Sequence, residues 1–167
     1  MPTALDVDPA TLDEYETNFV SKIRQHGWFG THVFEDEEGP GFSYTTGLWL
    51  NLNFPEVITF SLTREIAHDT FWHIVRMLKD GDVPAIGQPT DSIFENSGAA
   101  FLPVAERHFK EYLRWSRWFY RGNAFQCVQL VWSDREGQFP WQAGYSAEFT
   151  DAQPDLTEGA WAGLGGH

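Results

Sequence analysis

Three short apolar runs, each ended by a turn, constrain the fold of this chain more than any other feature. Residues 28–34, 42–50 and 56–62 are rich in aromatic and β-branched side chains, and segments with glycine or proline, "EDEEGPG" and "NLNFP", separate them. Short strands joined by short turns are typical of an antiparallel meander. We therefore predict that these three runs are neighbouring strands of one sheet.

Three other segments carry apolar side chains at the spacing of an amphipathic helix. In the clearest of them, Thr63 is the expected N-cap and the apolar stripe continues to Leu78. A first helix is expected over residues 8–27, because this segment opens with an Asp-Pro pair that is typical of a helix start. A third helix is expected over residues 106–120. Helices of this kind cover the face of a sheet.

The second half of the chain is expected to contribute further strands. Residues 124–132 have apolar side chains on both alternating faces, which predicts a central strand covered on both sides. Residues 101–105 are expected to form a short edge strand, because Pro103 cannot donate to a ladder. The segment 129–145 is interpreted either as a hairpin that packs the core or as the aromatic wall of a pocket.

The predicted elements together define the fold class. A chain of 167 residues suits one domain, which buries about 70% of its unfolded surface. We predict a single α+β domain over residues 1–145, with an antiparallel sheet of about five or six strands covered by two or three helices. Residues 146–167 are expected to form a loose acidic tail, because they are rich in glycine and contain neither lysine nor arginine.

The charge of the chain restricts its partners. Eleven basic residues against 24 acidic ones give a net charge of −13. Because nucleic acids bind to clustered lysine and arginine, no nucleic-acid partner is expected. The acidic run at residues 35–38 is either a solvated loop or part of a surface that attracts a basic protein.

Targeting features point to the cytoplasm. The longest apolar runs are too short to span a membrane, so no membrane partner is expected. The first residues are acidic and do not resemble a secretion signal. Cys127 is the only cysteine and has no partner within the chain for a disulfide, which fits a reducing compartment. We therefore expect a soluble cytoplasmic protein.

The sequence contains no recognised catalytic or metal-binding motif. It has no Gly-x-Ser-x-Gly elbow, no Walker loop and no Gly-x-Gly-x-x-Gly. His68 and His73 are five residues apart, so a helix would turn them about 140° from each other. His26 and His32 precede an acidic loop. His26 falls at the exit of the first predicted helix rather than in the strand of His32, so the sequence does not place the two imidazoles on one face. We expect neither a metal nor a cofactor. Cys127 is expected to be a buried structural residue.

Basic residues gather on the third predicted helix. At helical spacing, one side would carry a stripe formed by Arg107, Lys110, Arg114, Arg117 and Arg121. These side chains either pair with the protein's own acids or form a site for an anion or an acidic partner. In the second interpretation, Arg114 and Arg117 are the central residues, with Trp115 and Trp118 at the margins.

Polar and aromatic residues at the strand ends suggest a second candidate site. Along residues 42–50, the side chains of Tyr44 and Thr46 point to the same face. A hydroxyl cluster there would either admit a ligand or form the wet face of the sheet. The candidate residues for a pocket at the end of the sheet are Tyr44, Thr46, Trp132, Asp134 and Trp141, with His26 or His32 as possible additions.

Several of these segments resemble a bacterial domain-of-unknown-function family, number four-two-six-two. The resemblance extends from Gln25 to Tyr145. It is carried by "GFSYTTGL", by the Pro-Glu pair of "PEVITFSL" and by the segment "WSDREGQFPW", in which Ser133 stands where the family tends to have proline. The resemblance implies no established activity. The strand pattern is also similar, at the level of fold only, to suppressor-of-fused-like domains among bacterial immunity proteins.

Two functional classes follow from these observations. The first is a non-catalytic module that binds a basic protein, as an inhibitor or immunity protein does. The negative charge, the many aromatic residues and the lack of a catalytic motif favour it. The second is an enzyme or small-molecule-binding protein with an aromatic and polar pocket at the end of the sheet.

Overall fold

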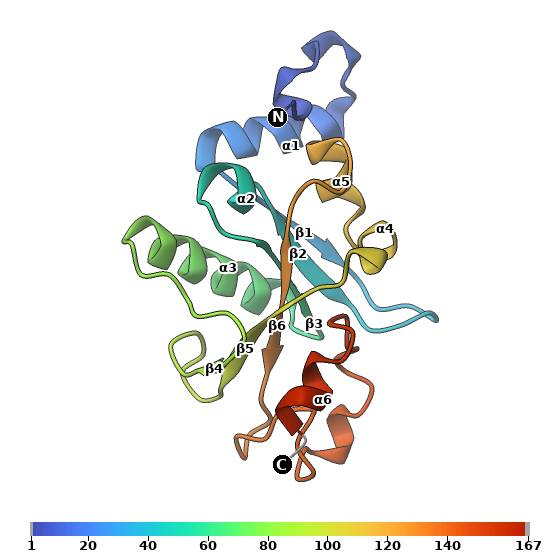
Figure 1. Ribbon diagram of the computed structural model, residues 1–167. Coiled ribbons are helices and arrows are strands. Elements are labelled where there is room, and N and C mark those ends of the chain that lie inside the picture. Colours follow the sequence, from blue (N-terminus) through green and yellow to red (C-terminus); the bar gives the residue numbers. More distant parts are fainter. Residues whose placement is uncertain (1, 166–167) are drawn as a thin grey trace.

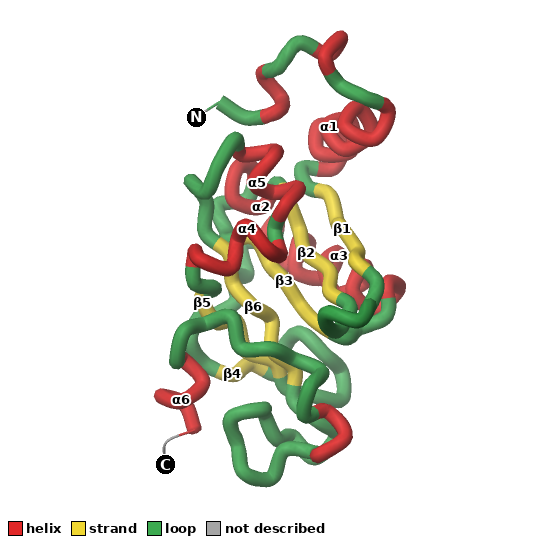
Figure 2. The backbone as a smooth tube through the Cα atoms, turned by 90° about the vertical axis from the view of Figure 1, so that its right-hand side faces the viewer, coloured by secondary structure: helices red, strands yellow, loops and turns green. Residues whose placement is uncertain are grey.

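The protein folds around one mixed β-sheet with helices on both faces. A computed structural model describes residues 2–165. Within these residues, six strands form a sheet in the order β1-β2-β3-β6-β5-β4. α1 and α6 lie at opposite ends of the molecule (Figures 1 and 2). β1 lies at one edge of the sheet, beside the turn that leads into β2 (Figure 2).

The strands and helices have the following bounds. The strands are β1 (Phe29–Val33), β2 (Phe42–Thr46), β3 (Glu56–Phe60), β4 (Pro89–Thr90), β5 (Ala99–Pro103) and β6 (Cys127–Trp132). The α-helices are α1 (Glu14–His26), α2 (Leu48–Asn51), α3 (Arg64–Lys79), α4 (Phe109–Tyr112), α5 (Arg114–Tyr120) and α6 (Ala160–Gly165). Short 3₁₀ turns occupy Ala4–Asp6, Pro9–Thr11, Glu106–His108 and Ala147–Phe149.

Two large apolar clusters form most of the core, one on each face of the sheet, and a smaller third cluster contains Ala100, Leu102, Val131 and Phe139. On one face, α3 packs against alternate residues of the central strands, among them Val57 and Leu130. On the other face, α1, α4 and α5 pack against the intervening residues, such as Ile58 and Cys127. The alternation of side chains along a strand explains this division. β6 is buried on both faces, as its sequence predicts.

The α+β class is confirmed, but the sheet is not purely antiparallel. β6 lies between β3 and β5, and it pairs in parallel with β3 and antiparallel with β5. A parallel pair needs a long crossover connection, and the chain between β3 and β6 includes α3, β5, α4 and α5. β5 is therefore not an edge strand, and Pro103 is tolerated because it is the last residue of β5.

Three predicted elements have different bounds in the structure. α1 begins at Glu14, because Asp13 and Glu16 form a capping box, while the Asp-Pro pair caps only a 3₁₀ turn. β2 ends at Thr46, and the positive φ of Gly47 turns the chain into α2. The predicted helix over residues 106–120 is interrupted at Leu113, whose side chain is buried in the core. The predicted basic stripe is therefore not continuous.

The segment after β6 also differs from the prediction. Residues 133–145 form turns rather than the second strand of a hairpin. The expected loose tail packs against the sheet: the Gln153 side chain accepts the Trp132 amide hydrogen at 3.0 Å and donates to the Trp132 carbonyl at 3.0 Å. Leu156 is buried in the core cluster of α1 and α5. Among the described residues, no helix has the length and apolar character that crossing a membrane requires.

Candidate functional site

A groove on one face of the β1–β2 hairpin is the main candidate site. It has a volume of about 780 Å³ and lies beside α4, α5 and the start of α1. We call it the Tyr44 groove. Its floor consists of β1 and β2 residues that include Thr31 and Tyr44, which face each other across the two strands. Its walls are Tyr15, Tyr112, Arg114 and Trp115, and its rim includes Asp36, Glu38 and Glu111.

Three hydroxyl groups lie close together where the floor of the Tyr44 groove meets its wall. Tyr44 is 1% exposed, and its hydroxyl oxygen accepts the Trp115 amide hydrogen at 3.0 Å. Burial raises the pKa of Tyr44 to about 12, and the Trp115 amide and the Thr31 hydroxyl oppose this rise. Burial also raises the pKa of Tyr15, again opposed by Thr31. We call Tyr15, Thr31 and Tyr44 the hydroxyl cluster.

Thr31 stands out within the hydroxyl cluster. It is 8% exposed, and no described residue forms a hydrogen bond of good geometry with its Oγ1 atom. It lies near the hydroxyls of Tyr15 and Tyr44, since it influences the pKa of both. Buried hydroxyls are nearly always hydrogen-bonded to protein or to ordered water, so the Thr31 hydroxyl is a point in the floor of the groove at which water or a ligand can bind.

Aromatic rings form much of the wall of the Tyr44 groove, and we call the part beside Tyr15 and Trp115 its closed end. The ring centroids of Tyr15 and Trp115 are 4.7 Å apart, so the two side chains contact each other where α1 meets α5. On the wall, Tyr112 packs edge-on against Phe42 with 5.3 Å between centroids. Apolar walls around a few polar groups are typical of binding sites.

We call the part of the Tyr44 groove that is lined by Phe34, Asp36 and Glu38 its open end; it is acidic and carries an exposed aromatic ring. Phe34 follows β1 directly and is 78% exposed. The next four residues, Glu35–Glu38, are all acidic, and they face Glu148 and Asp151 across a hollow of about 500 Å³. Phe34, which lies between acidic loops, is therefore the most solvent-exposed large apolar side chain among the described residues.

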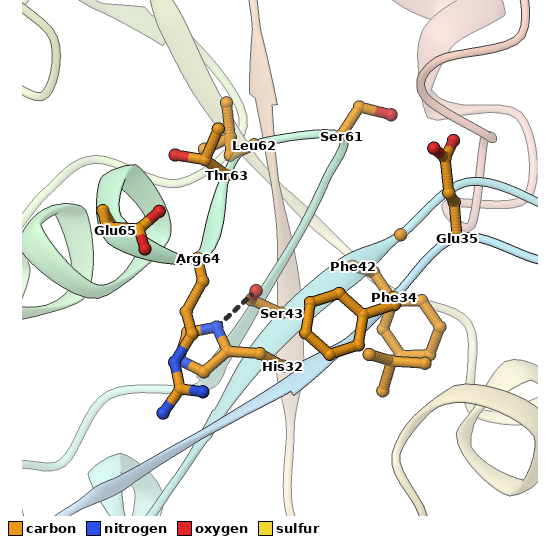
Figure 3. A pocket seen from close by; sticks show the side chains of 12 residues that line it. His32, Phe34, Glu35, Phe42, Ser43, Ser61, Leu62, Thr63, Arg64 and Glu65 are labelled. Atoms are coloured by element: carbon orange, nitrogen blue, oxygen red, sulfur yellow. Dashed lines mark hydrogen bonds between the residues drawn. The ribbon is translucent and has the colours of Figure 1, made fainter.

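A second cavity lies on the opposite face of the hairpin, next to the start of α3 (Figure 3). It has a volume of about 520 Å³, and we call it the Ser43 cavity. His32 Nδ1 and Ser43 Oγ are 2.7 Å apart. Burial, followed by the positive charge of Arg64, lowers the pKa of His32, while Glu65 opposes this effect. The neutral imidazole can therefore accept the Ser43 proton, although Ser43 is only 4% exposed.

A fully buried carboxylate supports the hairpin from below. The two oxygens of Glu56 accept hydrogens from the Thr45 and Tyr120 hydroxyls and from the amides of Gly47, Leu48 and Trp49. Burial raises the pKa of Glu56 to about 7 and outweighs these hydrogen bonds, which lower it. Glu56 lines neither cavity, so its role is to fix the turn between β2 and α2. In the sequence, the sign of this buried carboxyl group is that Glu56 is a single acidic residue at the start of an apolar strand.

The structure brings two of the predicted site residues together. Tyr44 and Arg114 both line the Tyr44 groove. Arg117 lies apart from them and donates to the Asn123 side chain at 2.7 Å. Arg107, at the start of the predicted stripe, pairs with Glu158.

The other candidates lie elsewhere. The Thr46 hydroxyl is buried against that of Ser116, 2.7 Å away. Trp132 donates its indole hydrogen to the Phe60 carbonyl at 2.9 Å. The Asp134 carboxylate accepts three backbone amide hydrogens, which hold the turn after β6 and lower the pKa of Asp134 against the effect of burial. Trp141 stacks on Phe139 with 4.7 Å between centroids. The structure therefore does not bring the five strand-end candidates into one pocket.

The residue content of both cavities was only partly predictable. The sequence does not single out Tyr15, Thr31 or Ser43 as site residues, because the sheet register and the packing of α1 bring them to the cavities. His32, a candidate metal ligand in the sequence, lines both cavities. Within residues 2–165, no group of three or more histidine, cysteine, aspartate or glutamate side chains is arranged to hold a metal ion.

The fold and the site define an α+β protein with a groove along an edge hairpin. The chain belongs to the family described as Domain of unknown function (DUF4262), whose model matches residues 22–146. This range includes β1, β2 and most of the residues that line the two cavities, but not Tyr15. Comparison with curated proteins and with solved structures gives no match.

Proposed function

We propose that this protein is a non-catalytic protein-binding module of the inhibitor or immunity type, and that it binds a basic partner through the Tyr44 groove. The observation that carries this proposal is Phe34, which is 78% exposed at the acidic open end of the groove. An exposed ring next to an apolar groove stabilises a complex when a partner removes it from water.

The position of the groove supports an extended partner segment. β1 is an edge strand, so the side of it that faces away from β2 can pair with another chain. Edge strands commonly bind peptides as an additional strand, with side chains placed in neighbouring pockets. A segment that pairs with β1 would lie beside the Tyr44 groove and pass Phe34.

The charge of the surface supports a basic partner. The net charge is −13, and the acids of residues 35–38 lie at the open end of the groove. Acidic surfaces attract basic partners and increase their association rate, and salt weakens this effect. The proposal places this interaction in the cytoplasm, in line with the single buried cysteine.

Selection from random peptide libraries displayed on phage, with the peptide C-terminus fused to the coat protein in one library and free in another, tests this function. We expect enriched peptides to combine lysine or arginine with aromatic or aliphatic residues. Their affinity should fall at least about tenfold for Phe34→Ala, because a central aromatic anchor contributes about 2 kcal/mol or more. Val83→Ala is the matched control, since Val83 is 63% exposed and lines neither cavity. Failure to enrich any peptide, or equal losses for both variants, would overturn the proposal.

A second candidate function is hydrolysis or acyl transfer in the Ser43 cavity. The 2.7 Å contact between His32 Nδ1 and Ser43 Oγ favours it, because a neutral histidine beside a serine can activate the hydroxyl as a nucleophile. A fluorophosphonate probe should then label the wild type but not Ser43→Ala or His32→Gln. Ser61→Ala is the matched control and should still be labelled, because Ser61 lines the same cavity but has no histidine partner in this proposal. Absence of labelling in the wild type would rule out this function.

A further inference from the structure

The unpartnered hydroxyl of Thr31 suggests what the closed end of the Tyr44 groove binds. Thr31 is 92% buried, as its 8% exposure implies, and its Oγ1 atom lies close to the Tyr15 and Tyr44 hydroxyls without a hydrogen bond of good geometry to any described residue. Leaving such a group without a hydrogen bond destabilises the fold. A ligand that offers an acceptor atom at this position would remove the penalty.

The polar groups around Thr31 can all donate hydrogens. The Tyr44 oxygen already accepts the Trp115 amide hydrogen, so its own hydrogen is free to donate. The hydroxyl of Tyr15 lies in the same cluster. Arg114 acts electrostatically on Tyr44, and its guanidinium forms no hydrogen bond or ion pair with another described residue. Three hydroxyls and a guanidinium together suit an anionic group with two oxygens, because arginine binds carboxylates through two parallel hydrogen bonds.

The shape of the groove indicates where this anionic group lies in a peptide. The rings of Tyr15 and Trp115 pack against each other with 4.7 Å between their centroids, and both line the groove beside the hydroxyl cluster, so an extended chain would meet them there. A chain that ends at this point places its terminus beside the hydroxyl cluster. An N-terminal ammonium would be repelled by Arg114, whereas a C-terminal carboxylate would be attracted. At the other end of the groove, Asp36 and Glu38 suit a basic side chain further upstream.

We infer that the hydroxyl cluster and Arg114 bind the C-terminal carboxylate of the partner, and that a basic residue upstream of this terminus lies against Asp36 and Glu38. The inference rests on the proposed function and specifies its ligand: a free C-terminus that follows apolar residues and a basic stretch. Capture of a terminal carboxylate is a known mode of peptide recognition.

A pair of synthetic peptides tests this inference. The probes are acetyl-Lys-Lys-Gly-Phe-Leu with a free carboxylate and the same peptide with a C-terminal amide. Their affinities for the full chain are measured by NMR titration, following the backbone amides. The free acid should bind at least about tenfold more tightly, because hydrogen bonds to a charged group are about twice as strong as neutral ones.

Three variants locate the effect. Thr31→Val and Arg114→Gln should each weaken binding of the free acid more than binding of the amide, and so reduce the preference for the free acid. Arg135→Gln is the matched control, since Arg135 is exposed and does not line the groove. The amide-proton shifts should include the backbone of Thr31, Tyr44 and Trp115.

The outcomes separate this inference from the proposed function. Equal affinity for the two peptides would overturn the inference, and so would the absence of binding by both. So would a preference that survives both Thr31→Val and Arg114→Gln. The library selection judges the proposed function independently, because it includes sequences that bind without a free terminus. Enriched peptides with a blocked terminus and undiminished affinity would leave the protein-binding function in place and remove only the carboxylate site.

Discussion

Replacement of Glu56 by glutamine should change how the stability of the protein depends on pH. The folded protein holds this carboxyl completely buried, which raises its pKa from about 4.5 to about 7. A group whose pKa is higher in the folded state contributes stability that is fully present below the unfolded pKa and is lost as the pH rises through the folded pKa. Because one pKa unit corresponds to about 1.4 kcal/mol, the wild type should lose about 3 kcal/mol between pH 4.5 and pH 7 at this residue.

Glu56→Gln removes the titration and alters one set of hydrogen bonds. The glutamine amide nitrogen fits best where Oε1 lies, since only one backbone amide, that of Leu48, would then lose its acceptor. At the Oε2 position it would face the amides of both Gly47 and Trp49. An unpartnered buried amide costs about 1–3 kcal/mol. The variant should therefore be less stable than the wild type at about pH 5, and this difference should shrink or reverse by about pH 8.

Urea unfolding, followed by tryptophan fluorescence at several pH values, measures this difference. All other titrating groups are common to both proteins, so the change in their stability difference reports on Glu56 alone. A difference in unfolding free energy between wild type and Glu56→Gln that stays constant from pH 5 to pH 8 would refute the reasoning. A gap that widens with pH would show that Glu56 is ionised in the folded state at pH 5, with its hydrogen bonds outweighing its burial.

Two further substitutions test the hairpin, each with a matched control and with thermal or urea unfolding as the readout. Thr31→Val should raise the free energy of unfolding by about 1 kcal/mol, because it replaces an unpartnered buried hydroxyl by a methyl group. Thr46→Val should lower it by about 1 kcal/mol or more, since the Thr46 hydroxyl is hydrogen-bonded to Ser116. A loss of stability in Thr31→Val would mean that its hydroxyl is satisfied in solution. Gly47→Ala should destabilise by about 3 kcal/mol or more, because the added Cβ would lie 2.5 Å from the Gly27 carbonyl oxygen at a φ of +115°. Gly81→Ala, at a φ of +80° with open space around it, should cost only about 1 kcal/mol, and equal losses at the two glycines would contradict the clash.

Local signals in the sequence predict the elements whose caps and periodicity agree. α3 follows its prediction closely, because Thr63 caps it and a continuous apolar stripe faces the sheet. α1 begins later than predicted, because two aspartates can each cap a helix and only Asp13 is followed by a glutamate three residues on. The break at Leu113 depends on tertiary packing, which periodicity does not report.

The composition of the candidate site is less predictable, for a physical reason. Tyr44 and Arg114 are 70 positions apart in the chain, and they meet only because α5 packs on β2, where the Trp115 amide binds the Tyr44 hydroxyl. Thr31 joins them through the register of β1 against β2. The parallel position of β6 likewise depends on a long crossover that short-range patterns do not encode.

The central claim is that the Tyr44 groove binds an extended basic segment of a partner. The most direct measurement is NMR mapping of a selected peptide on the ¹⁵N-labelled protein. We predict that the largest amide shifts fall on β1, β2, residues 34–40 and the start of α5. Shifts confined to α3 or to residues 82–98, with the hairpin unchanged, would contradict the claim.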